Sequence, residues 1–372
     1  MKFTKRFFAT TFTLTGSIIG AGILGLPYVF SQSGFVVGLF WLFFLGAIMI
    51  FVNLSLGEVA LRTKNIHQIP GYAGKYLGIW GKRILLFAVM FGIYSALLAY
   101  LIGEGQSFSK LFFGDINYAI YFAFGFWAIM TLLLREGLRN LKKVELWGVI
   151  VIIVIIFGIF IALSQNINPS NLNYYDTSNL FLPFGIVLFS LLGFTAIPEL
   201  RIMAKRKEKL LKKAIIFGTL IPIFLYFLFT LVFVGVLGKS INEISTLSFG
   251  NTIVVLGIFT MMTSYFVLSF SLRDIFIYDL GKKRSTAFLF VSISPILIYS
   301  LFVFFDLASF IKILGIGGAI SGGITGILIL LMNIKAKKKG NRKPEFSIPI
   351  NWLIIGILSL VFTLGVLAEL FF

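Results

Sequence analysis

The sequence predicts an all-α polytopic membrane protein with eleven transmembrane helices, of which the first and the sixth are broken. Three observations lead to this fold class. Of the 372 residues, 59% are hydrophobic and only 12% are charged, against roughly 25% charged in soluble domains. Apolar runs long enough to cross ~30 Å of hydrocarbon alternate with short basic loops. Glycine and proline interrupt two of these runs at corresponding places.

We expect eleven spans, each an apolar run bounded by charged loops. They cover residues 7–31, 34–61, 83–103, 117–134, 144–163, 181–200, 214–238, 251–279, 286–305, 308–334 and 348–370. With a cytoplasmic N-terminus, 29 of the 32 lysines and arginines fall in cytoplasmic loops. This positive-inside asymmetry predicts a multi-pass protein of the inner (plasma) membrane with an external C-terminus.

The second broken span stands five positions after the first, so ten spans divide into two five-helix halves of opposite orientation. The first half would cover residues 1–163 and the second, inverted half residues 181–334. The polar segment 164–180 is expected as an outer loop, and residues 335–372 as a basic cytoplasmic loop with an eleventh helix. The aromatic segment 63–82 is expected to form a short interfacial helix.

Composition excludes several classes of function. The chain has no cysteine, which excludes disulfides and thiolate nucleophiles, and its single histidine, His67, makes a histidine-based metal site unexpected. The net charge of +18 lies in short loops between spans, so it signals orientation rather than nucleic-acid binding. No signal peptide is evident, since the first apolar run is too long. Without a nucleophile–base pair or metal cluster, we do not expect an enzyme.

The first interruption lies within the run from Gly16 to Tyr28, which holds four glycines in ten residues and then Pro27. Each glycine weakens a helix by roughly 1 kcal/mol, and proline removes a backbone N–H. Backbone groups cannot stay unpaired in lipid, so this break should line a protein cavity and offer its amides and carbonyls to a ligand. The alternative is a glycine-lined face for helix packing.

The second interruption lies in the sixth span, where Ser190 and Gly193 stand midway between Pro183 and Pro198. Paired interruptions at corresponding positions of two halves point to the binding site of a transporter. A chance pairing remains the alternative, because the tenth span is also rich in glycine; there we expect close packing.

Three motifs resemble those of the amino acid/auxin permease family, within the amino acid–polyamine–organocation (APC) superfamily. They are GSIIGAGILGLPYVFSQSG in the first span, GYAGKYLG after the second and FSLLGFTAIPE in the sixth. The resemblance covers most of the chain and implies the LeuT-type 5+5 inverted repeat and secondary amino acid transport. Phe194 stands where many relatives carry a histidine, which argues against proton coupling through a histidine here.

The central parts of spans one, three, six and eight carry no charge, which suits a net-neutral zwitterion such as a neutral amino acid. Its carboxylate would sit on free amides at the start of the second half-helix, and its ammonium group on carbonyls at the ends of the first half-helices and on a serine hydroxyl. The side chain would meet phenylalanines of the sixth span, with Tyr94 or Tyr100. The predicted substrate residues are Ile18, Ile19, Ala21, Gly22, Ile23, Phe189, Ser190, Leu192 and Phe194.

A coupling ion is expected between the first and eighth spans. By position relative to the motifs, the LeuT-type resemblance implies sodium held by carbonyls and hydroxyls, here those of Gly16, Ile19, Thr263 and Ser264. A proton would need a titratable group, and the central spans offer none, so sodium is favoured over proton; no other cofactor is expected. The alternative is that these hydroxyls bond back to their own helix.

Charged residues at the cytoplasmic ends of the spans are expected to form an inner gate. The set is Glu58, Glu199, Arg273 and Asp274. Glu58 stands four residues before Arg62, a spacing that favours an ion pair, while Glu199 ends the sixth span beside Arg201 and Asp274 follows Arg273. The alternative is that these charges only reach to the membrane interface. Glu104 and Glu369 are expected on the outer side, solvated.

The function predicted is that of a secondary active transporter for a neutral amino acid, a monomer in the lipid bilayer. An amino-acid sensor on the same fold is the rival hypothesis. A channel is disfavoured because no filter motif or charged pore stripe is found.

Overall fold

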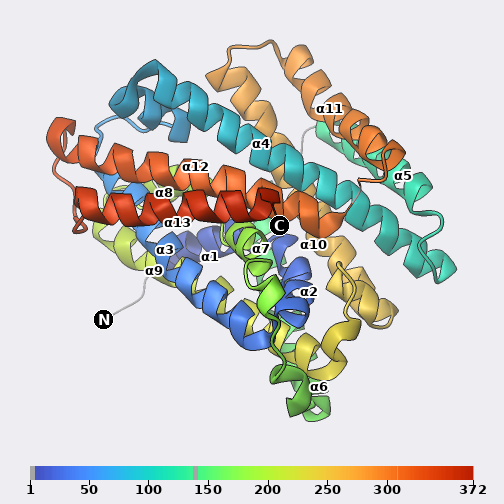
Figure 1. The fold of residues 1–372 in the computed structure, drawn as a ribbon. Helices are drawn as coiled ribbons and strands as arrows, with labels where there is room; N and C mark the ends of the chain where they lie inside the picture. The colour runs from blue at the N-terminus through green and yellow to red at the C-terminus, as the bar shows by residue number, and fades with distance from the viewer. Residues whose placement is uncertain (1–4, 137–140, 308, 372) are drawn as a thin grey trace.

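The computed structural model describes residues 5–136, 141–307 and 309–371, apart from the side chains of residues 136–147 (Figure 1). The helices are α1 (Lys5–Ile18), α2 (Gly22–Ser33), α3 (Phe35–Arg62), α4 (Ile69–Phe113), α5 (Ala119–Glu136), α6 (Leu141–Leu163), α7 (Pro183–Ser190), α8 (Ile197–Met203), α9 (Leu211–Leu237), α10 (Asn251–Asp274), α11 (Arg284–Phe304), α12 (Phe310–Lys339) and α13 (Trp352–Phe371). Short 3₁₀ turns and one π-helical turn, Ile275–Asp279, complete them.

The described residues confirm an all-helical membrane fold. Among them, nine helical segments are long and apolar enough to cross a membrane, and α1 with α2 would make a tenth, bent by 57°. The shorter apolar helix α5 lies between α4 and α6, where a further span is expected. Eleven spans and an inverted repeat remain predictions.

Both predicted interruptions are present. In the first span, α1 ends at Ile18 and α2 begins at Gly22. In the sixth, α7 ends at Ser190, and a 3₁₀ turn over Phe194–Ala196 leads into α8. α7 and α8 each begin with a proline in the first turn, where no intrahelical N–H is needed. The glycines and prolines therefore act locally as the sequence predicts.

The third span differs from the prediction of residues 83–103. α4 runs from Ile69 to Phe113 and turns sharply at Gly78, which has a left-handed φ of 78°. The predicted interfacial helix is thus the first part of α4, joined to the span by a glycine kink. Tyr72 and Tyr76, before the kink, are buried, and only Trp80, just after it, is exposed, so only part of the predicted segment's aromatic surface lies on the outside.

α12 is the central packing helix and lies between α4 and α13 (Figure 1). Its glycines let neighbouring backbones approach closely: a Cβ on Gly318 would lie 2.7 Å from the amide nitrogen of Phe189 in α7, and one on Gly326 would lie 2.8 Å from the ring of Phe362 in α13. Small residues at helix contacts are usual in membranes, where packing rather than hydrophobic exclusion drives association. Close packing by this span is confirmed.

The connecting loops meet at two opposite ends of α3. At its C-terminal end, Asn341 N–H donates to the Arg62 carbonyl at 3.0 Å, and Arg342 donates to the Leu61 carbonyl at 2.8 Å. At its N-terminal end, Trp41 Nε1 donates to the Leu180 carbonyl at 2.7 Å, which holds the loop 164–182. We call the first end, where the basic loops after α3, α8 and α12 lie, the basic face, and the second the opposite face.

Arg201 joins α8 to the end of α3. Its guanidinium is 7% exposed and donates to the carbonyls of Thr63 at 2.6 Å and Lys64 at 3.3 Å, and to the Tyr72 hydroxyl at 3.3 Å. The last carbonyls of a helix have no partner within it and attract a cation. Arg201 thus caps α3 and fixes the half-helix α8 to it.

Replacing Arg201 by methionine should lower the free energy of unfolding by about 1.5–3 kcal/mol, because hydrogen bonds to a charged group are lost while the apolar stem is kept. Thermal unfolding in detergent measures this. Lys209→Met, which changes an exposed basic residue on the same face, is the control and should leave the midpoint unchanged. An unchanged midpoint for Arg201→Met would contradict this role.

Candidate substrate-binding site

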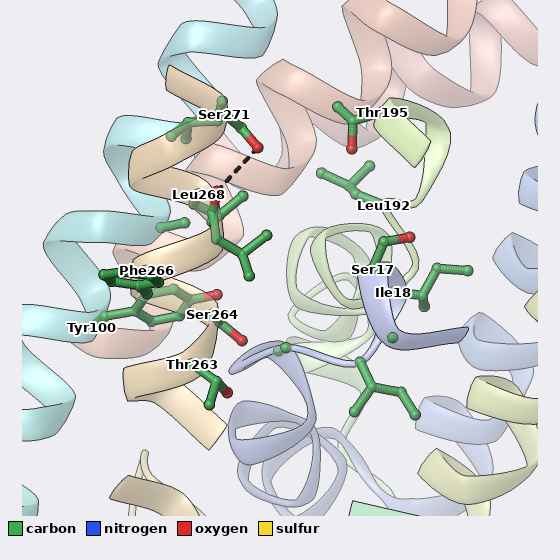
Figure 2. A pocket seen from close by; sticks show the side chains of 18 of the residues that line it. Ser17, Ile18, Tyr100, Leu192, Thr195, Thr263, Ser264, Phe266, Leu268 and Ser271 are labelled. Atoms are coloured by element: carbon green, nitrogen blue, oxygen red, sulfur yellow. Dashed lines mark hydrogen bonds between the residues drawn. The ribbon is translucent and has the colours of Figure 1, made fainter. Parts of the chain in front are cut away.

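A cavity of about 280 Å³ lies between the two helix breaks. Its walls come from both breaks and from α4, α5, α6, α10 and α12. Figure 2 shows α10 on one side of the cavity and the segments around Ile18 and Leu192 on the other. The cavity therefore forms where the paired interruptions predict a binding site.

The two breaks pack reciprocally against each other. A Cβ on Gly22, just after the first break, would lie 2.7 Å from the Cα of Ser190, the last residue of α7. A Cβ on Gly193, inside the second break, would lie 2.9 Å from Cδ1 of Ile18, the last residue of α1. Each break thus needs a glycine where it meets the end of the other span's first half-helix.

Tyr226 of α9 connects the ends of the two first half-helices. Its hydroxyl is 2.9 Å from the Ile18 carbonyl and 2.9 Å from the Ser190 carbonyl, and its side chain is 0% exposed. A phenol has one hydrogen, so it donates to one carbonyl at a time. Both carbonyls were predicted for the substrate ammonium group; they keep lone pairs for it but share them with Tyr226. Nothing in the sequence pattern singled out this tyrosine.

Tyr100 of α4 covers the start of α2. Its hydroxyl lies 3.3 Å from where a Cβ on Gly20 would be, and Ser264 Oγ lies 3.6 Å from the same point. The tyrosine hydroxyl therefore stands beside the backbone that was predicted to hold the substrate carboxylate. Gly20 remains open toward the cavity.

Most of the predicted substrate residues line the cavity. Those that do are Ile18, Ile19, Gly22, Phe189, Ser190, Leu192 and Phe194. Ala21 and Ile23 do not line it, and they are only 0% and 2% exposed within the core. Their predicted role concerns their backbone amides and stays a prediction. Further lining residues that the sequence did not indicate come from α4, α5, α6 and α12.

The predicted cation residues Gly16, Ile19, Thr263 and Ser264 all line this same cavity. Figure 2 shows the Thr263 and Ser264 side chains projecting from α10 toward it. The Thr263 hydroxyl donates to the Phe259 carbonyl at 3.0 Å and lies 3.1 Å from the Thr260 carbonyl, so the back-bonding alternative is present, yet its oxygen keeps lone pairs. Neutral oxygen donors suit a hard cation such as sodium. In the described part of the chain, no group of three or more His, Asp or Glu could hold a metal.

The predicted gate residues lie in separate clusters. Glu58 is 0% exposed and is bound by Arg62 at 2.7 Å, the Ser347 hydroxyl at 2.8 Å and the Ile348 amide at 3.0 Å, so the predicted pairing with Arg62 is confirmed. Arg273 lies 3.6 Å from Asp274 at the end of α10. Glu199 begins α8. Glu58 therefore fastens the α12–α13 loop to α3 rather than meeting Asp274.

The cavity reaches from the breaks toward the basic face. Along α10 it follows the C-terminal half as far as Ser271, and along α6 it follows the N-terminal part, from Gly148 to Ile152. Beyond Gly22, α2 contributes nothing to the lining. The structure thus shows a conformation whose binding cavity faces the side of the basic loops.

Comparison with known proteins identifies related permeases. A family model described as the tryptophan/tyrosine permease family matches residues 3–371. The chain is similar to glutamine transporter 2 of Aliivibrio fischeri (23% identical, 96% of each chain) and to tyrosine-specific transport system 1 of Haemophilus influenzae (25% identical, 62% of this chain and 58% of the relative). It is also similar to amino acid transporter AVT1H of Arabidopsis thaliana (25% identical, 70% and 64%). The matches confirm that the relatives are amino acid permeases. The family that matches is, however, not the amino acid/auxin permease family that the motifs resemble.

Substitutions at Gly20 and Gly22 should separate binding from folding. Gly22→Ala should cost about 1–3 kcal/mol of unfolding free energy, because its Cβ meets the Ser190 backbone. A larger side chain there would disrupt the α2–α7 contact as well as the site. Gly20→Ala should stay within about 1 kcal/mol of the native stability, and it should weaken ligand binding because it narrows the cavity beside Tyr100.

Thermal unfolding and ligand-induced thermal shifts measure both effects. The control is Gly250→Ala, at a position where a Cβ meets nothing within 4 Å. If Gly20→Ala binds amino acids as the native chain does, the carboxylate does not approach this part of the break.

Proposed function

Because the chain belongs to the tryptophan/tyrosine permease family, we propose that it is a secondary active transporter of a neutral amino acid that works by alternating access and couples to sodium. The observation that carries the proposal is the cavity at two apposed helix breaks. Among the described residues that line it there is no Asp, Glu, Lys, Arg or His. A site without fixed charge favours a ligand without net charge, since an unpaired charge is costly within a membrane protein.

The helix ends supply complementary partial charges for a zwitterion. α1 ends at Ile18 and α7 at Ser190, and the C-terminal ends of helices are partly negative, which favours an ammonium group. α2 begins at Gly22, and the N-terminal end of a helix is partly positive, which favours a carboxylate. These ends lie beside each other through the reciprocal glycine contacts. The two charged groups of one amino acid would be held there by the backbone.

The remainder of the cavity is suited to an apolar side chain. Phe189, Leu192 and Phe194 line it from the second break, and Met262 and Phe266 line it from α10. Apolar and aromatic walls with a few polar groups are usual for small-molecule sites. We therefore propose a neutral amino acid with a largely apolar side chain as the substrate.

The LeuT-type inverted repeat is part of the same proposal. Gly22 meets the end of α7, and Gly193 meets the end of α1, so each break makes the same kind of contact with the other. Two halves related by a pseudo-two-fold axis would produce such reciprocal contacts. Rocking of one half against the other would then turn the cavity from the basic face to the opposite face.

Counterflow of labelled amino acids in proteoliposomes tests transport. A transporter exchanges external label for internal amino acid, whereas a sensor binds the label without accumulating it. If the protein binds the labelled amino acid but no exchange is measured, the sensor hypothesis is favoured over transport.

Sodium coupling predicts that an inward sodium gradient alone drives uptake. Thr263→Ala with Ser264→Ala should raise the sodium concentration for half-maximal uptake at least about tenfold, equivalent to about 1.4 kcal/mol. Thr260→Ala is the control, because its hydroxyl also bonds back to α10 at 2.8 Å but does not line the cavity. Sodium would be rejected as the coupling ion if a proton gradient drives uptake in sodium-free buffer and this uptake is the same in the double variant as in the native protein.

The proposed orientation places the basic face in the cytoplasm. Single cysteines in this cysteine-free chain test it, at the exposed positions Thr177 in the loop 164–182 and Lys209 between α8 and α9. In intact cells an impermeant maleimide should label position 177, and it should label position 209 only after the membrane is opened. The reverse pattern would invert the topology.

A further inference from the structure

Glu104 is a buried acid in a membrane-spanning helix and has no hydrogen-bond partner among the described residues. Its side chain is 0% exposed, and in the described part of the chain neither carboxyl oxygen makes a hydrogen bond. The sequence-based prediction of a solvated residue is therefore wrong. An unpaired carboxylate is far more costly to bury in such a place than a neutral carboxylic acid. In this conformation the burial of Glu104 therefore favours its neutral form over the carboxylate.

Glu104 lies in the layer that separates the cavity from the opposite face. It follows Tyr100 by four residues on one side of α4, about 6 Å farther along the helix axis. Its neighbour Gly103 packs tightly, since a Cβ there would lie 2.5 Å from Met261 Sδ in α10 and 3.2 Å from the ring of Phe310 in α12. Glu104 itself does not line the cavity. It is thus sealed in where the protein is closed.

Among the described residues, no basic side chain is paired with Glu104. The titratable groups around this layer, on α2, α4, α5, α10, α11, α12 and the loop before α10, are Tyr28, Tyr100, Lys110, Tyr121, Lys239, Glu243, Tyr265, Tyr299 and Lys312. Lys239 lies over the Tyr174 ring, 3.5 Å from its centroid. Lys110 donates to the Gly114 carbonyl at 2.8 Å, and the Lys312 side chain is exposed. Glu243 is occupied by the Ser309 hydroxyl at 3.0 Å. Between Ala119 and Leu134, α5 carries no Asp, Glu, Lys, Arg or His.

Within the described part of the chain, other polar atoms near this layer also lack hydrogen-bond partners. Ser107, three residues after Glu104 and on the same side of α4, is 0% exposed with an unpaired hydroxyl. Thr246 has an unpaired hydroxyl 2.5 Å from where a Cβ on Gly257 of α10 would lie, one turn outward from Met261. Buried polar groups are normally satisfied by protein or water. These groups are suited to a second conformation in which water reaches them.

We propose that Glu104 is a proton-binding site that controls closure of the opposite face. The carboxylate takes a proton from the solution on that face when the face is open, and the neutral acid is then buried as the face closes. On reopening, the proton returns to the same solution, so it is not carried across the membrane. Raising the pH should therefore favour the conformation in which the opposite face is open. This inference rests on the proposed alternating access but not on sodium coupling.

The test uses a cysteine reporter without substrate or sodium. Thr246→Cys places a single thiol at a position that is 0% exposed here, and its rate of alkylation by a maleimide reports opening. From pH 5 to pH 8 the rate should rise more steeply in the native background than in Glu104→Gln, which imitates the neutral acid. At pH 8 we expect a difference of at least about tenfold. Thiol ionisation is common to both proteins and cancels in their ratio.

The matched control is Glu369→Gln. Glu369 is the rival carboxyl group, since it lies on α13 against Gly185 and Gly315 near the start of α7. Its replacement should leave the steep pH dependence intact. The proposal is overturned if the alkylation rate depends on pH in the same way in the native and Glu104→Gln proteins. It is also overturned if the steep rise with pH is lost in Glu369→Gln instead.

Folding of each variant is checked by size exclusion and thermal unfolding. Should Glu104→Gln not fold, Glu104→Asp keeps an acid on a shorter side chain, and its pH profile should persist with a shifted midpoint. If Glu104→Asp folds but its alkylation rate shows no steep rise with pH, Glu104 is not the proton-binding site. Because the reporter needs no transport, a failure of the proposed function in counterflow is distinguishable from a failure of this inference.

Discussion

The arrangement depends on the reciprocal contact between the two helix breaks. Gly22 admits the backbone of Ser190, and Gly193 admits the side chain of Ile18, at separations that leave no room for a Cβ. Backbone that is neither helical nor hydrated is tolerated at membrane depth only inside protein or beside a cavity. Because each break shelters the other, both persist in the core, and the cavity forms beside them.

The aromatic hydroxyls of Tyr226 and Tyr100 complete this contact. Tyr226 bonds the carbonyl ends of α1 and α7, and the Tyr100 hydroxyl lies beside Gly20, just before α2. The Tyr226 bonds satisfy backbone groups that would otherwise be orphaned in a medium of low polarity. They also set a condition on binding, since a ligand must share or displace them. A zwitterion is suited to that exchange because its two charged groups match the two kinds of helix end.

Around the breaks, some elements are tied rigidly and others only at their ends. α12 is fixed to α4, α7 and α13 by glycine contacts along its length. α8 is held by Arg201 to the end of α3, and Arg6 at the start of α1 donates to the Lys205 carbonyl just after α8 at 3.0 Å. The half-helices on the basic face are therefore linked to each other and to α3 by polar contacts at their ends. On the opposite face, the layer of Glu104 and Gly103 is closed by side-chain packing.

The sequence by itself determined the membrane class, nearly all span positions, both breaks and the segregation of basic loops, because hydropathy, Gly/Pro chemistry and loop charge act over a few residues. It also indicated the cavity residues that come from the two breaks, together with Thr263 and Ser264 of α10, but not those that come from α5, α6 and α12. Only the tertiary structure decided what the carbonyls of Ile18 and Ser190 bind, because Tyr226 lies 208 and 36 residues away from them along the chain. The same holds for Arg201, which neighbours Glu199 in sequence but meets the end of α3 in space, and for Glu104, whose position near a span end suggests solvent. Burial and pairing depend on which surfaces of distant helices meet, and no local pattern encodes that.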